Sequence, residues 1–118
     1  MKKRLQSFGY AGRGIWQVFR SETNMKIHVL IAVLVVIFGF YFQISIQEWI
    51  ACLFCIGLVF SAEMINTAIE NVVDLASPLH HELAGKAKDI AAGAVLICAI
   101  ISAIIGLLIF IPKAWALL

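Results

Sequence analysis

The sequence predicts an all-α integral membrane protein, in which three transmembrane helices follow an N-terminal amphipathic surface helix. The composition points to the membrane, because 63% of the 118 residues are hydrophobic and only 14% are charged, which lies well outside the range of soluble domains. Apolar segments of helical length then recur three times along the chain. A chain of this size has room for a single domain, residues 1–118. Any chemistry must therefore be carried by the transmembrane helices themselves.

Residues 4–20 have the pattern of an amphipathic helix. Apolar side chains recur at helical spacing, and basic and polar side chains lie off that stripe. The apolar positions are Leu5, Phe8, Gly12, Ile15, Trp16 and Phe19. Two compatible interpretations follow: the helix lies in the membrane interface, or it packs on the rest of its own bundle.

The three spans are expected at residues 25–43, 48–73 and 85–111. The first is short for the roughly 20 residues that a span requires, and the second is long enough only if the polar stretch 62–74 continues it. Before the third span, Ser77 suits a helix cap and Pro78 suits the first helical position, so this helix is expected to begin outside the apolar core. Pro112 is expected to end it.

Basic residues are distributed unevenly between the two sides of the expected spans. Six lie before or at the start of the first span, the loop at 43–48 has none, and Lys86 and Lys88 lie at the start of the third span. The positive-inside rule therefore places the N-terminus and the second loop in the cytoplasm. Lys113, beyond the third span, is the single exception.

The second span carries a polar stripe on its inner half. With about 100° of rotation per residue, Glu63, Asn66 and Glu70 share one face with Thr67 and Asp74. The opposite face of this helix is apolar. An ionised carboxylate in a span costs on the order of 2.5 to 3.5 kcal/mol, so a stripe of them requires a cationic partner.

A divalent metal ion is one such partner for the polar stripe. Glu22, beside Asn24 at the cytoplasmic start of the first span, adds a carboxylate at similar depth. Mg²⁺ prefers one or two carboxylates together with phosphate oxygens, which indicates a nucleotide site. Two alternatives stay open: a polar seam that joins helices, and a proton or cation path in an ion-coupled transporter. The ion path is disfavoured, because the outer halves of the three spans carry no polar residues that would continue it across the membrane.

The second loop supplies a further polar face. On a helix that runs into the third span, His81, Gly85, Lys88 and Asp89 fall within about 100° of arc. A lysine held there can bind phosphate oxygens as a point charge. The neighbouring pair of histidines lacks the spacing of a zinc site. His28, at the start of the first span, is expected at the membrane interface rather than in a site.

Three motifs together resemble one family of membrane enzymes. The stretch "EMINTAIENVVD", followed by "HELAGKAKD" and "AAGAVL", is similar to the small prokaryotic diacylglycerol kinase family, which includes diacylglycerol kinase and undecaprenol kinase. The resemblance covers nearly the whole chain. It implies a homotrimeric helical bundle in the bacterial inner membrane that transfers the γ-phosphoryl group of ATP, with Mg²⁺, to a lipid hydroxyl. The sites are then composite and lie at subunit contacts on the cytoplasmic side.

The resemblance also implies roles for the polar residues. Glu63 corresponds to the general base for the lipid hydroxyl, and Asn66 corresponds to a residue that positions the substrate. Glu22 and Glu70 correspond to the metal-coordinating carboxylates. The nucleotide-binding positions are Glu22, Glu70, Asp74, His81, Lys88 and Asp89, with Lys3 or Arg4 as a further basic residue. The choice between Lys3 and Arg4 stays open.

The expected acceptor is undecaprenol, which would give undecaprenyl phosphate, with diacylglycerol as the alternative. The stretch from Asp74 to Leu96 is more similar to the undecaprenol kinase branch of the family. Both acceptors present a hydroxyl at the interface on an apolar body, so physical chemistry alone does not separate them. The expected partners are ATP, Mg²⁺, the lipid alcohol and further copies of the chain, and no nucleic acid.

Overall fold

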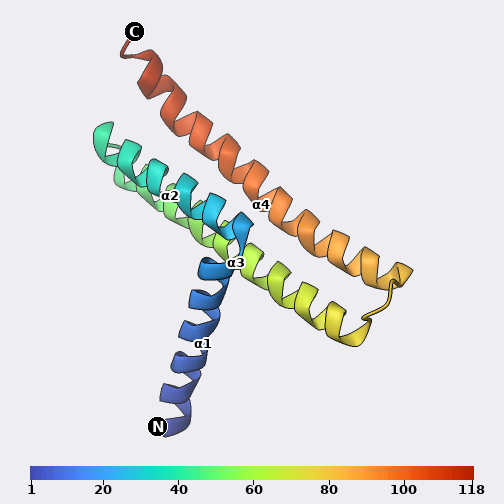
Figure 1. The fold of residues 1–118 in the computed structure, drawn as a ribbon. Helices are drawn as coiled ribbons and strands as arrows, with labels where there is room; N and C mark the ends of the chain where they lie inside the picture. Colours follow the sequence, from blue (N-terminus) through green and yellow to red (C-terminus); the bar gives the residue numbers. More distant parts are fainter.

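Four helices make up the chain, and the computed structural model describes all 118 residues (Figure 1). The helices are α1 (Lys2–Ser21), α2 (Thr23–Tyr41), α3 (Ile46–Ala76) and α4 (Glu82–Trp115). The last three are long and apolar enough to cross a membrane. The predicted all-α fold class with three membrane-crossing helices is therefore confirmed. Helix α2 begins and ends slightly earlier than its expected span, whereas α3 and α4 extend beyond theirs at both ends.

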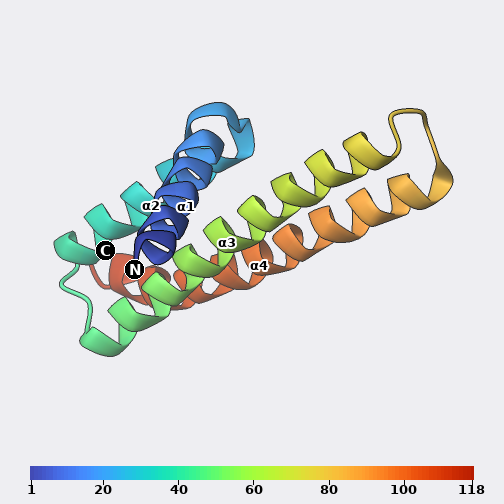
Figure 2. The same cartoon turned by 90° about the horizontal axis from the view of Figure 1, so that it is seen from below.

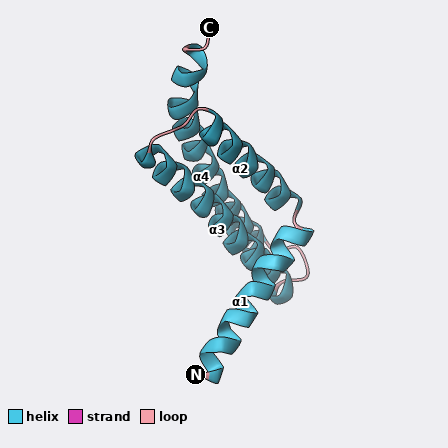
Figure 3. Ribbon diagram, turned by 90° about the vertical axis from the view of Figure 1, so that its left-hand side faces the viewer, coloured by secondary structure: helices cyan, strands magenta, loops and turns pink.

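The helices are arranged as a long hairpin with two shorter partners. Helices α3 and α4 run antiparallel and side by side, and α2 lies along only one half of α3 (Figure 2). Helix α1 projects away from the bundle at the point where α2 begins (Figure 3). Its last turns touch the hairpin, since the rings of Phe19 and Phe60 meet edge to face with centroids 5.2 Å apart. The start of α2 therefore faces the middle of α3.

The bundle buries very little of itself. Only ten of the 118 residues are buried, and most of the large apolar side chains on α2, α3 and α4 are exposed. In a water-soluble protein most of these side chains would be buried in a hydrophobic core. Here the apolar faces belong against lipid or against other membrane helices, because a membrane-spanning helix is apolar all round.

The start of α3 and the end of α4 lie together at the end of the hairpin away from the 77–81 loop, which we call its outer end. Polar contacts join the two helices there. Ser45 and Glu48 form a capping box at the start of α3, in which the backbone N–H of Glu48 donates to Ser45 Oγ at 3.1 Å and that of Ser45 donates to Glu48 Oε1 at 2.9 Å. Such a box satisfies two orphan donors of the first turn. The other oxygen of Glu48 lies 3.2 Å from Lys113 Nζ on α4. Lys113, the exception to the charge pattern, is thus neutralised by a carboxylate.

Two expected helix boundaries on the third span are wrong. Ser77 is instead the C-cap of α3, because its backbone N–H donates to Val73 O at 2.8 Å. Pro78 therefore lies in the 77–81 loop, and α4 begins at Glu82 with His81 as its cap. At the other end, Pro112 lies inside α4, which continues to Trp115. Proline has no backbone N–H, so α4 lacks one hydrogen bond at this position but is not ended by it.

A close contact between glycine and tryptophan fixes α2 against α3. Gly39 is buried, and the Trp49 ring covers it so closely that a Cβ atom on Gly39 would lie 2.5 Å from Cη2 of Trp49. The Trp49 ring also packs on Phe40, with ring centroids 4.9 Å apart. Glycine is required here because the tryptophan ring occupies the space of any side chain.

Replacing Gly39 by alanine is therefore expected to destabilise the protein by about 1 to 3 kcal/mol, the usual cost of overpacking a filled site. Thermal unfolding in detergent micelles measures the change. Gly57→Ala is the matched control, since a Cβ atom there meets nothing within 4 Å, and it should leave the midpoint unchanged or raise it. Adding Trp49→Leu to Gly39→Ala should restore part of the loss. Equal midpoints for the two alanine variants would contradict this packing.

Candidate active site

The polar stripe of α3 faces the interior of the bundle. The buried polar or charged residues are Glu63, Asn66 and Thr67, with exposed fractions of 2%, 6% and 7%. All three come from the stripe that the helical period predicts. A bundle with so small a buried interior nevertheless places a carboxylate, an amide and a hydroxyl in it. Burial of polar groups without full pairing is unfavourable, so this position calls for an explanation beyond packing.

A cavity of about 270 Å³ lies beside these side chains, between α2, α3 and α4. Its polar lining is formed by Asn24, His28, Glu63 and Asn66. Ala92 and Ala99 are among the residues that α4 contributes. Val95 and Leu96 of the same helix complete its apolar wall. The cavity therefore joins the start of α2 to the inner half of α3.

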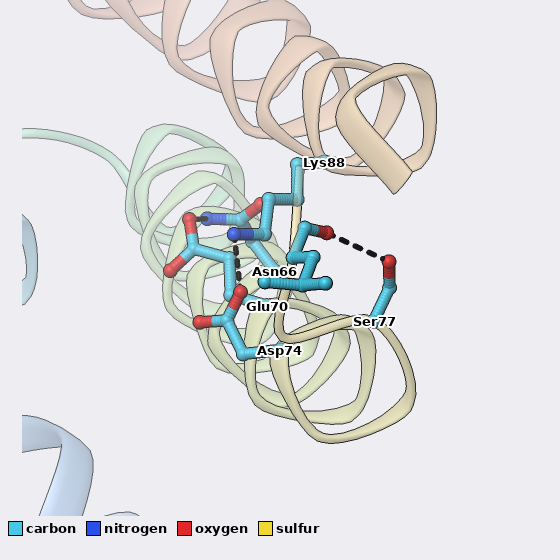
Figure 4. Close-up of polar contacts among 6 residues, drawn as sticks. Asn66, Glu70, Asp74, Ser77 and Lys88 are labelled. Atoms are coloured by element: carbon cyan, nitrogen blue, oxygen red, sulfur yellow. Dashed lines mark hydrogen bonds and ion pairs between the residues drawn. The ribbon is translucent and has the colours of Figure 1, made fainter. Parts of the chain in front are cut away.

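Asn66 is only partly satisfied by hydrogen bonds. Its Nδ2 donates to Glu70 Oε1 at 3.1 Å, one helical turn further along α3 (Figure 4). Its Oδ1, like the Oγ1 of Thr67, is buried and has no hydrogen-bond partner. A buried acceptor without a partner is costly and uncommon in proteins. The free Oδ1 is thus available to a ligand in the cavity.

The Glu63 carboxylate has one polar contact, with a residue that sequence reasoning placed elsewhere. His28 Nε2 lies 3.8 Å from Glu63 Oε2. His28 was not expected in a site, but it lines the cavity beside Glu63. It follows Asn24 by four residues on α2, so both face α3. The four-residue spacing between Asn24 and His28 predicts that both share one face of α2. It predicts a position beside Glu63 only when the pairing of α2 with α3 is known.

Two further carboxylates act on Glu63. The charges of Glu22 and Glu70 both lie within electrostatic range of it. Glu22 occupies the junction between α1 and α2, and it is half-buried. Glu70 follows on the stripe. Three acidic residues predicted for the site thus gather around the inner half of α3.

Asp74 and Lys88 meet where the inner ends of α3 and α4 face each other. They form an ion pair between the two helices (Figure 4). Their side chains are 62% and 40% exposed, and exposed pairs of this kind contribute little to stability. Lys88 is therefore held near the stripe without being buried, and it remains accessible to an anion from solution.

The remaining predicted residues are not brought together with this group. His81 caps α4 by accepting a hydrogen bond from the Leu83 N–H at 3.0 Å on its Nδ1, and Asp89 is exposed on the first turns of the same helix. Lys3 and Arg4 lie at the free end of α1, far from the stripe within one chain (Figure 1). The geometry of a single chain therefore does not choose between Lys3 and Arg4.

The side chains fit a magnesium ion that arrives with a nucleotide. No group of three histidine, cysteine or acidic side chains converges on one point in the chain. Mg²⁺ in nucleotide sites takes one or two carboxylates and draws its other ligands from phosphate and water. Glu22, Glu70 and the free Oδ1 of Asn66 match that donor set.

Known proteins share this sequence over nearly its whole length. The sequence model of the family described as prokaryotic diacylglycerol kinase matches residues 9–110. Undecaprenol kinase of Bacillus subtilis is 51% identical over 96% of this chain and 92% of its own length. Diacylglycerol kinase of Synechocystis is 36% identical, over 97% of this chain and 66% of its own length. Diacylglycerol kinase of Escherichia coli K12 is 29% identical, over 85% of this chain and 82% of its own length.

The match runs through most of α1, the three membrane-crossing helices and the polar stripe. The family resemblance predicted from the three sequence motifs is confirmed. The chain belongs to the prokaryotic diacylglycerol kinase family, whose members are membrane lipid kinases.

Proposed function

We propose that the chain phosphorylates undecaprenol with MgATP at the cytoplasmic face of the bacterial inner membrane. The observation that carries this proposal is the buried Glu63 carboxylate, which borders a cavity in the inner half of a membrane-crossing helix. A base in this position can reach the hydroxyl of a lipid that stays in the membrane. Asp74 and Lys88, exposed at the end of the hairpin, can meet a nucleotide from the aqueous side. The two substrates then approach from opposite directions.

Glu63 acts as the general base in the proposed reaction. As the oxygen of the lipid hydroxyl attacks the γ-phosphorus of ATP, the O–H bond breaks and the proton passes to the Glu63 carboxylate. A new O–P bond forms, and the bond from the γ-phosphorus to the bridging oxygen breaks, with its electron pair leaving on ADP. Asn66 orients the reacting groups through its unpaired Oδ1. Phosphoryl transfer depends chiefly on such positioning and on charge neutralisation.

The nucleotide and its magnesium ion are held toward the aqueous end of the stripe. Glu22 and Glu70 hold Mg²⁺, which when bound neutralises the charge of the phosphates. Lys88 binds phosphate or adenosine groups together with Asp74, His81 and Asp89, and Lys3 or Arg4 adds a basic contact. A lysine pairs with phosphate as a compact charge. The exposed Asp74–Lys88 pair opens at little cost when a phosphate competes for the lysine.

We also propose that the protein works as a homotrimer with its sites at subunit contacts. The small buried fraction supports this, because ten buried residues do not make a self-sufficient bundle. The distance of Lys3 and Arg4 from the stripe within one chain supports it as well (Figure 1). In an assembly, a basic residue on α1 can reach the site of a neighbouring copy.

The sequence comparisons favour undecaprenol over diacylglycerol as the acceptor. The undecaprenol kinase relative is 51% identical to this chain, against 36% and 29% for two diacylglycerol kinases. An apolar groove of about 450 Å³ between α2, α3 and α4 is contiguous with the polar cavity, since His28 and Ala99 line both. A lipid tail fits such a groove whether it is isoprenoid or acyl. The groove therefore supports a lipid acceptor without choosing between the two.

Glu63→Gln tests the proposed base. The substitution keeps the shape of the side chain and removes the proton acceptor, so we expect turnover to fall by about 10²- to 10⁴-fold. The KM for MgATP should change by no more than about twofold, because Glu63 faces the lipid. Steady-state transfer of labelled phosphate from ATP in detergent micelles measures both constants. Wild-type turnover in the variant would contradict the role of Glu63.

Glu70→Gln tests the metal-binding carboxylate. Glutamine retains the oxygen that accepts from Asn66 Nδ2, so the variant isolates the loss of charge. We expect the KM for MgATP to rise about tenfold, equivalent to about 1.4 kcal/mol, and higher Mg²⁺ concentrations to recover part of the rate. Glu82→Gln, an exposed carboxylate in the first turn of α4, is the matched control and should leave this constant unchanged. Equal constants for the two variants would argue against a metal role for Glu70.

A direct comparison of acceptors tests the proposed lipid. Undecaprenol and diacylglycerol are presented separately in the same micelles with labelled ATP, and the labelled products are separated by chromatography. We expect undecaprenol to be phosphorylated at least about tenfold more efficiently, a preference of about 1.4 kcal/mol in transition-state binding. The reverse preference would identify diacylglycerol as the acceptor. Glu63→Gln, run beside the wild type, confirms that the transfer comes from this chain.

A further inference from the structure

His28 stands at the junction of the two hollow regions of the bundle. It lies in the second turn of α2 and lines both the polar cavity beside Glu63 and the long apolar groove. Its side chain is 17% exposed, and Met25, three residues before it, is fully buried. The imidazole is thus held in the interior rather than free at the surface. His28 therefore borders both the space that can hold a lipid tail and the space beside Glu63.

The charges around Glu63 give this imidazole a specific electrostatic role. Glu63 is almost completely buried, and the other acids that act on it, Glu22 and Glu70, carry the same charge. His28 is the only basic side chain in ion-pair contact with Glu63. Lys88 is paired with Asp74 instead. A buried carboxylate needs a donor or an opposite charge, and the geometry leaves that task to His28.

The 3.8 Å separation of His28 Nε2 and Glu63 Oε2 defines how the pair can act. It is longer than a hydrogen bond, and contacts of catalytic groups are often loose before the substrate binds. A small rotation of either side chain brings the imidazole N–H to the carboxylate. The second carboxylate oxygen then remains free to face the lipid hydroxyl in the cavity.

We propose that His28 is a positioning residue for the phosphoryl transfer, which orients the Glu63 carboxylate at the junction of the polar cavity and the apolar groove. This inference rests on the proposed function of Glu63. In the step itself, the lipid O–H bond breaks and its proton passes to Glu63, the hydroxyl oxygen forms its bond to the γ-phosphorus, and the bridging oxygen leaves with ADP. The Nε2–H of His28 donates to the other oxygen of Glu63 throughout and does not transfer its proton.

Two substitutions of His28 separate positioning from packing. His28→Leu removes the donor, and His28→Gln places an amide N–H near the position of Nε2. We expect His28→Leu to lower kcat by at least about tenfold with the KM for MgATP unchanged within about twofold. His28→Gln should recover a substantial part of kcat. His80→Leu, which alters an exposed histidine in the 77–81 loop, is the matched control. The acceptor is whichever of undecaprenol and diacylglycerol the wild type phosphorylates faster.

A double-mutant cycle with Glu63 tests whether His28 acts through that residue. Rates are measured for the wild type, His28→Leu, Glu63→Gln and the double variant. If His28 acts through Glu63, its loss in the Glu63→Gln background changes kcat by less than about twofold, since the effects of residues that act as a unit are not additive. Additive losses, an unchanged kcat in His28→Leu, or a change confined to the KM for MgATP would each overturn the proposal. Where His28→Leu unfolds on heating below the assay temperature, the same cycle is run with His28→Phe, which keeps a planar ring in the same space but has no N–H donor.

The role of Glu63 as base and the role of His28 as positioning residue are refuted by different results. Wild-type turnover in Glu63→Gln refutes the base itself, whatever His28 does. Loss of turnover in Glu63→Gln, together with full turnover in His28→Leu, refutes only the positioning role.

Discussion

The structure depends on a carboxylate buried inside a helix that is otherwise made for the membrane. Burying Glu63 costs free energy that only a partner or a protonated state can offset. The surrounding helices place polar groups and an open cavity next to this carboxylate. The start of α2 places Asn24 and His28 beside it, and α4 presents alanines where larger side chains would fill the space. The same arrangement leaves Asn66 Oδ1 without a partner. Groups that are left unsatisfied in the free protein can be satisfied by substrates.

The two ends of the hairpin serve different purposes. At the outer end, the capping box of Ser45 and Glu48, the Glu48–Lys113 pair and the Gly39–Trp49 contact hold α2, α3 and α4 together. At the inner end, α3 and α4 continue beyond α2, and their polar side chains meet only through an exposed ion pair (Figure 2). The outer end thus supplies rigidity, and the inner end keeps its polar groups accessible. A preorganised site on rigid helices suits a reaction that depends on positioning.

The sequence alone predicted the features that follow from helical periodicity. The three spans, the amphipathic helix and the common face of Glu63, Asn66 and Glu70 all come from local spacing, which the fold preserves. Features set by contacts between distant segments were not predictable. Ser77 and Pro78 carry good helix-start signals, but Ser77 caps the end of α3, and α4 begins only at Glu82 with His81 as its cap. The pairing of His28 with Glu63 and of Lys113 with Glu48 also required the packing of the helices.

The central claim is that the carboxylates on the inner half of α3 meet the metal–nucleotide complex. Replacing Mg²⁺ by paramagnetic Mn²⁺ tests it directly, because bound Mn²⁺ broadens the NMR signals of nearby nuclei. In isotopically labelled protein with MnATP, we expect broadening at Asn66, Glu70 and the first turns of α4, and sharp signals at Ser45 and Lys113 at the outer end of the hairpin. Broadening centred on the outer end, or absent from the inner half of α3, would contradict the account.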